Sequence, residues 1–204
     1  MALNVGGLFR SGYHFEDPPI ARALFSSTAS AWFWLLVRLY VGYEWLEAGL
    51  HKFADPKWMS DGTALLGYWK GAVAVPAAPA RAAITYDWFR SFLQVLIDHD
   101  TSVWFAKLIV FGELAIGVGL IVGAFVGVAA FFGALMNMNF MLAGSASTNP
   151  VLFFLAVGLM LAWKVAGYYG ADRVLLPLVG TPWHGHTRDQ AVAPTAGAPI
   201  ARTT

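Results

Sequence analysis

The stretch that decides the fold runs from Val103 to Leu142 and reads VWFAKLIVFGELAIGVGLIVGAFVGVAAFFGALMNMNFML. Its strongly polar side chains are those of Lys107, Glu113, Asn137 and Asn139. As one helix it would be about 60 Å long, roughly twice the ~30 Å hydrocarbon core of a bilayer. We therefore predict two membrane spans, over 103–121 and 124–142, which turn back on each other at the small residues around Gly123.

Two further apolar segments, 31–49 and 151–169, flank this pair, and the second follows Asn149-Pro150, which is typical of a helix start. The sequence thus predicts an all-α, four-helix membrane bundle that forms a single domain over residues 1–204. Composition agrees, because 58% of the 204 residues are hydrophobic and 12% are charged. The first 30 residues lack the early apolar core of a secretory signal, so we expect the first span to be retained.

The loop between the first two spans is long and patterned. Apolar residues recur in it at near-helical spacing, which predicts an amphipathic helix on the membrane surface or over the end of the bundle: Ile84, Trp88, Phe89, Phe92, Leu93, Val95 and Leu96. The segment 62–71 is a second candidate, interfacial or re-entrant. The Ala-, Pro- and Thr-rich tail, about 190–204, is predicted to be disordered.

Composition also excludes several functions. A net charge of +1 without a run of Lys and Arg gives no sign of nucleic-acid binding. The absence of cysteine excludes disulfides, thiolate nucleophiles and cysteine-ligated iron–sulfur clusters. Haem is not expected, because the last three spans contain no histidine and His51 lies at the end of the first. His184 and His186 are interpreted as solvated tail residues, so we predict no metal site.

The ionisable residues inside the spans are Arg38, Glu44, Glu47, Glu113 and Lys164. Because a charge at the centre of a membrane helix costs about 2.5–3.5 kcal/mol on insertion scales, each should face the bundle interior, a partner or water. We expect Glu113, near mid-depth, to reach Arg38 or Lys164 in an ion pair that locks the bundle. Lys52 and Lys107 are expected to extend their ammonium groups toward the interface.

The first span presents two surfaces at about 100° per residue. Glu44, Glu47 and His51 share one of them, and we expect these carboxylates to line a cavity with Asn137 or Asn139. Two acids one turn apart repel each other when ionised, so at least one is expected to be protonated or paired with a cation and able to exchange protons with a ligand. The other surface carries small residues suited to close helix packing, as does the third span: Gly42, Gly49, Gly127, Ala130 and Ala134.

Several motifs resemble those of the DoxX/DoxD family of membrane proteins. Arg38-x3-Gly42 with Gly49-x2-Lys52 is similar to the opening of that family. Gly112-Glu113-x3-Gly117, Asn139 with Ala143-Gly144-Ser145, Asn149-Pro150, and Gly167-Tyr168-Tyr169-Gly170-Ala171-Asp172 follow in the same order. The long first loop resembles the DoxD-like members, the membrane subunit of thiosulfate:quinone oxidoreductase. The resemblance covers about residues 30–180.

The resemblance implies electron transfer from thiosulfate to a membrane quinone, with a second small subunit as partner. In that hypothesis Glu44, Glu47 or Glu113 exchanges the protons of the quinone. Arg38, Trp45, Asn137 and Asn139 are candidates to bind it, and Lys52, Lys57 and Lys107 would form an entrance for an anionic substrate. The Lys and Arg count is equal on the two sides of the bundle. With the resemblance, we expect a multi-pass protein of the cytoplasmic (inner) membrane with both termini in the cytoplasm.

A different class of function also fits the sequence. The chain could be a non-catalytic accessory subunit, packed against a larger respiratory or photosynthetic complex, with its polar residues serving to lock the bundle. A proton-coupled transporter is a third hypothesis, less favoured because four helices without an evident repeat suit alternating access poorly.

Overall fold

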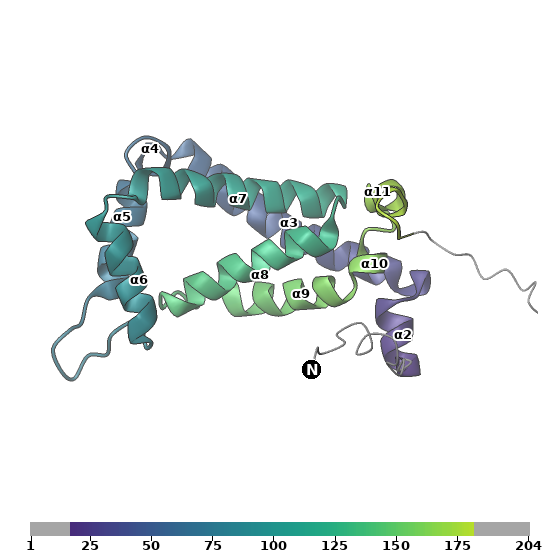
Figure 1. Cartoon of the computed structure of the whole chain (residues 1–204), viewed down its shortest axis with the longest axis horizontal. Coiled ribbons are helices and arrows are strands. Elements are labelled where there is room, and N and C mark those ends of the chain that lie inside the picture. Colours follow the sequence, from purple (N-terminus) through teal and green to yellow (C-terminus); the bar gives the residue numbers. More distant parts are fainter. Residues whose placement is uncertain (1–16, 182–204) are drawn as a thin grey trace, which may run out of the picture.

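The computed structural model describes residues 17–181, and these contain helices and no strand. The helices are α2 (Pro19–Phe25), the 3-10 helix η1 (Thr28–Ser30), α3 (Ala31–Ala54), α4 (Pro56–Met59), α5 (Thr63–Val73), α6 (Asp87–Asp98), α7 (Ser102–Val122), α8 (Val126–Leu142), α9 (Asn149–Leu161), α10 (Trp163–Ala166) and α11 (Asp172–Leu178). Figure 1 shows α3, α7, α8 and α9 lying lengthwise, with α5 and α6 standing across one end. The predicted disordered tail, and also His184 and His186, lie outside the described residues.

The turn between α7 and α8 confirms the predicted break. Gly123 has a φ of 73°, a conformation that glycine adopts without a steric penalty, and it closes α7 with a hydrogen bond from its N–H to the carbonyl of Gly119 at 2.9 Å. Phe125 also has a positive φ, of 47°, immediately before α8. The long apolar stretch thus folds back into two antiparallel helices.

Glycines set the close contact of α3 with α7. A Cβ atom on Gly42 would lie 2.9–3.1 Å from atoms of Leu120 and Ile121, and one on Gly49 would lie 2.9–3.1 Å from Leu114. On the facing helix, a Cβ atom on Gly117 would lie 2.7 Å from the backbone nitrogen of Leu46. The helices therefore run antiparallel with their backbones nearly touching, which confirms the predicted glycine surface.

The third and fourth predicted spans pack as α8 against α9 and α10. A Cβ atom on Gly127 would lie 2.7 Å from the Cβ atom of Trp163, and Ala130 and Ala134 are buried. The predicted span over 151–169 is wrong as one continuous helix. It ends at Leu161, and a separate turn, α10, follows Ala162.

The long loop contains the predicted amphipathic helix. In α6, Phe89 and Leu93 are buried, and Trp88, Phe92 and Val95 are exposed. The buried side chains join Leu65 and Trp69 of α5, and residues of α7, in a second apolar cluster. The candidate segment 62–71 is likewise helical, as α5. Together α5 and α6 form a wall beside the end of α7.

Among residues 17–181, one helix, Ser102–Val122, is by itself long and apolar enough to cross a membrane. The pair Pro19–Phe25 and Thr28–Ala54 would be a second if its 57° bend lay within one span. The apolar helices α8 and α9 have 17 and 13 residues, so their lengths are about 26 and 20 Å. Many large apolar side chains of these long helices nevertheless point outward, Phe111, Phe131 and Phe154 among them.

Candidate functional site

The antiparallel register of α3 and α7 creates a buried ion pair. It brings Lys52, in the last turn of α3, against Glu113 in the middle of α7. The Nζ atom of Lys52 lies 2.8 Å from each carboxylate oxygen of Glu113. The Glu113 side chain is 1% exposed and that of Lys52 is 22% exposed. The prediction that Glu113 pairs with Arg38 or Lys164 is therefore wrong. The prediction for Lys52 is also wrong, because its ammonium group turns inward to this carboxylate and does not extend to an interface.

Arg38 is buried at the opposite end of α3. Its guanidinium donates to the carbonyls of Leu120 and Ile121 at the end of α7, and to the carbonyl of Tyr169 at 2.9 Å. These bonds satisfy the last carbonyls of a helix, which have no partner within it. Arg38 thus joins three segments at this end of the bundle. Lys164, the other expected partner, is exposed and lies over the ring of Trp163.

Asp172 is a buried acid for which the sequence indicated no role. It accepts hydrogen bonds from the backbone N–H groups of Phe125, at 2.6 Å, and Val126, at 2.9 Å. It therefore caps the N-terminus of α8 from a distant part of the chain. Burial raises the pKa of the Asp172 carboxyl, and these hydrogen bonds and the charge of Arg38 oppose that effect.

A polar cavity of about 310 Å³ lies beside the ion pair, within the range of about 300–1,000 Å³ typical of ligand pockets. We call it the polar cavity, and its lining residues are Glu44, Trp45, Ala48, Lys52, Trp58, Tyr68, Glu113, Asn137, Phe140, Ser145, Ser147, Thr148, Asn149 and Leu152. They come from α3, α4, α5, α7, α8, α9 and the turn between α8 and α9. Helices distant in sequence therefore converge on one small space.

Two buried polar groups on this wall lack a protein partner. Asn137 is fully buried, and neither its amide oxygen nor its amide nitrogen has a hydrogen-bond partner among the described residues. The indole nitrogen of Trp45 is also buried without one. An unsatisfied buried polar group costs about 1–3 kcal/mol of folding stability, so such groups usually have a hydrogen-bond partner. The described chain does not supply one here. A ligand or water in the polar cavity can supply it.

The predicted acids and amides separate in space. Glu44 and Asn137 line the polar cavity, as the sequence predicted for that pair. Glu47 does not line that cavity. Its side chain is half-exposed, and its Oε1 atom lies 4.0 Å from the Nε2 atom of the exposed His51. Asn139 donates to the carbonyl of Leu135 in its own helix at 2.8 Å and lines a different, apolar groove.

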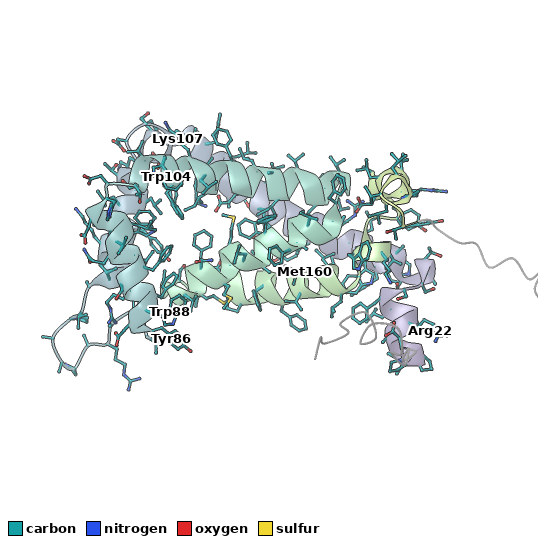
Figure 2. All side chains as sticks on the ribbon, viewed as in Figure 1. Arg22, Tyr86, Trp88, Trp104, Lys107 and Met160 are labelled. Carbon is teal, nitrogen blue, oxygen red and sulfur yellow. The ribbon has the colours of Figure 1, made fainter. Side chains whose placement is uncertain are left out.

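Of the three lysines of the predicted basic entrance, Lys52 lines the polar cavity. Lys57 is exposed, and Lys107 is half-buried in the second turn of α7, near the end that Figure 2 shows beside α4 and α5. Neither lines the polar cavity, where Lys52 supplies the ammonium group. Within residues 17–181 no cluster of three or more His, Cys, Asp or Glu residues could hold a metal ion.

Tyr68 is a site residue that the sequence did not single out. Its hydroxyl donates to the carbonyl of Phe140 at 3.4 Å, and burial raises its pKa, so the phenol stays protonated near neutral pH. Tyr68 and Phe140 line both the polar cavity and the apolar groove that adjoins it. The sequence predicts that 62–71 is interfacial or re-entrant, whereas the place of its Tyr68 on the wall of the polar cavity depends on the tertiary structure.

The chemistry of the polar cavity suits a small ligand with both acceptors and donors. Asn137, Trp45 and Lys52 provide N–H donors, and Glu44 and Glu113 provide carboxylate acceptors. The charge of Lys52 is already matched by Glu113. The cavity therefore favours a neutral, carbonyl-bearing group over a dianion.

Comparisons with protein-family models, with curated proteins and with solved structures found no match to this chain. The resemblance to the DoxX/DoxD family therefore rests on the motifs themselves, and its functional content stays a prediction.

Proposed function

We propose that the chain is a four-span membrane protein in which α3, α7, α8, and α9 with α10 cross the bilayer. The support is the outer surface, where large apolar side chains of all four long helices are exposed: Trp32, Leu36, Tyr43, Phe111, Val118, Phe131, Val151, Phe154 and Leu161. Soluble monomers rarely expose apolar patches larger than a few hundred Å². The shorter helices are accommodated by local thinning of the bilayer at modest cost.

Reporter fusions test this topology. Fusions after Gly123 and after Gly170 should report the same side as the N-terminus, and fusions at Ala77 and Ser147 the other side. A result in which Gly123 and Ala77 report the same side would exclude four spans.

Within that bilayer we propose a quinone-linked oxidoreductase subunit of the DoxX/DoxD type, whose polar cavity binds the quinone head. One observation carries the proposal. The amide of Asn137 is fully buried on the cavity wall, with neither polar atom bonded to the described protein. A quinone carbonyl would accept from Asn137 or Trp45, and the volume fits a single ring with its substituents.

In this proposal the residues that line the polar cavity have different roles in the reduction of the quinone. Reduction of a quinone to a quinol takes two electrons and two protons. Glu113, held beside the cavity by its ion pair with Lys52, would pass one proton on: its carboxylate takes the proton from the Lys52 ammonium group and gives it to the reduced carbonyl, and a proton from water then restores the ammonium group. Glu44, on the same wall but less buried, is the group that connects the cavity with the aqueous side.

The electrons come, in this proposal, from a sulfur oxyanion of the thiosulfate type, which the resemblance implies. Two thiosulfate ions lose two electrons as one S–S bond forms to give tetrathionate. This oxidation would take place outside the polar cavity, on a partner subunit, because the cavity has no cation left to balance a dianion.

Asn137→Leu is the direct test, with Asn139→Leu as its matched control one half-turn away. Quenching of tryptophan fluorescence by a tailless dimethoxybenzoquinone should show weaker binding for Asn137→Leu and unchanged binding for Asn139→Leu. Glu113→Gln should slow donor-driven quinone reduction by about 10²–10⁴, the usual contribution of general acid–base catalysis, when the rate is measured per molecule of folded protein. Unchanged binding in Asn137→Leu, together with recovery of the wild type only inside a large assembly, would favour the accessory-subunit hypothesis instead.

A further inference from the structure

The polar cavity has an apolar neighbour. A groove of about 630 Å³ lies between α7 and α8, with α5 and α6 closing one end. Figure 1 shows α7 and α8 diverging from their shared turn toward α5 and α6. We call it the apolar groove. Its lining includes Phe92, Leu96, Leu108, Ala115 and Phe132.

The two spaces share a boundary. Tyr68 and Phe140 line both of them, and the hydroxyl of Tyr68 donates to the carbonyl of Phe140 at that boundary. On one side lie Asn137, Glu113 and Lys52, and on the other the lining is almost entirely hydrocarbon. A polar space beside a larger apolar space suits a molecule with a polar head and a hydrocarbon chain.

We propose that the apolar groove holds the isoprenoid chain of the quinone whose head occupies the polar cavity. The inference rests on the proposed function and narrows its substrate to long-chain quinones. The chain passes beside Tyr68 and Phe140 and reaches the bilayer between α7 and α8.

The head, and not the chain, fixes this position. Lipid chains are as apolar as the side chains of the groove, so a hydrocarbon chain alone gains little by leaving the bilayer for it. A chain attached to a head bound at Asn137 is held at the groove by its covalent link. Occupancy of the groove should therefore depend on the polar cavity.

Photo-crosslinking tests that dependence. The probe is a long-chain quinone with a diazirine on its isoprenoid chain, added to the full-length protein in phospholipid nanodiscs. Adducts mapped by mass spectrometry are expected on groove residues such as Leu96 and Phe132 and not on Val118, which is exposed on α7 and does not line the groove. Asn137→Leu should abolish the groove adducts although it changes no groove residue.

A blocking variant tests the groove itself. Ala115→Phe places a ring where Ala115 lines the groove, and Val118→Phe makes a similar change on the lipid-facing side of the same helix. Ala115→Phe should lose the groove adducts and keep binding of tailless dimethoxybenzoquinone, and Val118→Phe should keep both. Retention of both in Val118→Phe also shows that a new ring on α7 does not disturb the fold.

The outcomes separate the two proposals. If the tailless quinone binds but adducts fall evenly over lipid-facing residues, or persist in Asn137→Leu, the chain site is refuted and the head site stands. Equal groove labelling by a diazirine phospholipid would also refute it, because the groove would then be a lipid site. If the wild type binds neither quinone, both proposals fail.

Discussion

Breaking the ion pair between Lys52 and Glu113 should destabilise the protein much more than removing an exposed charge. Lys52→Met leaves a carboxylate that is 1% exposed without a partner, and Glu113→Leu leaves an ammonium group. Loss of one member of a buried pair costs about 3–5 kcal/mol. Because Lys52 keeps 22% of its side chain exposed, water already screens part of this pair, and we expect the lower end, about 3 kcal/mol.

Thermal unfolding of the purified protein in one detergent measures the effect. For a chain of this size 1 kcal/mol shifts Tm by about 2–4 °C, so each single variant should lose about 6–12 °C. The double variant should lie close to the wild type, because replacing both charges with apolar groups leaves neither of them stranded. Lys57→Met, an exposed lysine on α4, is the control and should change Tm by less than about 2 °C.

The pH dependence distinguishes the two single variants. Without Lys52, Glu113 can become neutral by taking up a proton. For an ordinary glutamate this protonation costs about 4 kcal/mol at pH 7, and the cost falls by about 1.4 kcal/mol for each pH unit below that. Lys52→Met should therefore be less destabilised at pH 5.5 than at pH 7, and Glu113→Leu should not. If the double variant loses the sum of the single effects, the two groups do not act as a pair and the reasoning is refuted.

Three further changes probe the fold. Gly117→Ala should lower the unfolding free energy by about 1–3 kcal/mol, because the new Cβ atom would lie 2.7 Å from the backbone nitrogen of Leu46. Gly67→Ala is the control and should be neutral or stabilising, because its Cβ atom would have no neighbour within 4 Å. Equal Tm values for the two variants would exclude the close contact. Asp172→Ala should cost about 1–2 kcal/mol and increase amide exchange at the start of α8, and unchanged exchange there would contradict the cap. Hydrogen bonds from Thr63 lower the pKa of Asp61, so their stabilisation is present above the unfolded value of 3.8 and is lost as pH falls through the lower folded value. Thr63→Val should thus lower Tm at pH 6 by more than at pH 3, and a pH-independent difference would contradict this.

The sequence determined the helices and their apolar faces because those depend on local spacing. The turn at Gly123, the starts and ends of α7 and α8, and the amphipathic character of α6 follow from patterns within a few residues. The glycines that bring α3 against α7 were also visible, because a missing side chain is a local fact. The break at Ala162 was not, because the apolar pattern continues through it without a Gly or Pro.

The partners of the buried polar groups were decided by the tertiary structure. The sequence predicted that the first span ends at residue 49, which left Lys52 outside it, but α3 continues to Ala54 and holds that ammonium against α7. Asn137 and Asn139 lie about 200° apart around one helix, so only one can face the polar cavity, and the position of α3 decides which. A sequence pattern fixes the angle between two side chains on one helix, whereas the group that each one meets depends on the rotation and register of the neighbouring helix, which the packing of the whole bundle sets.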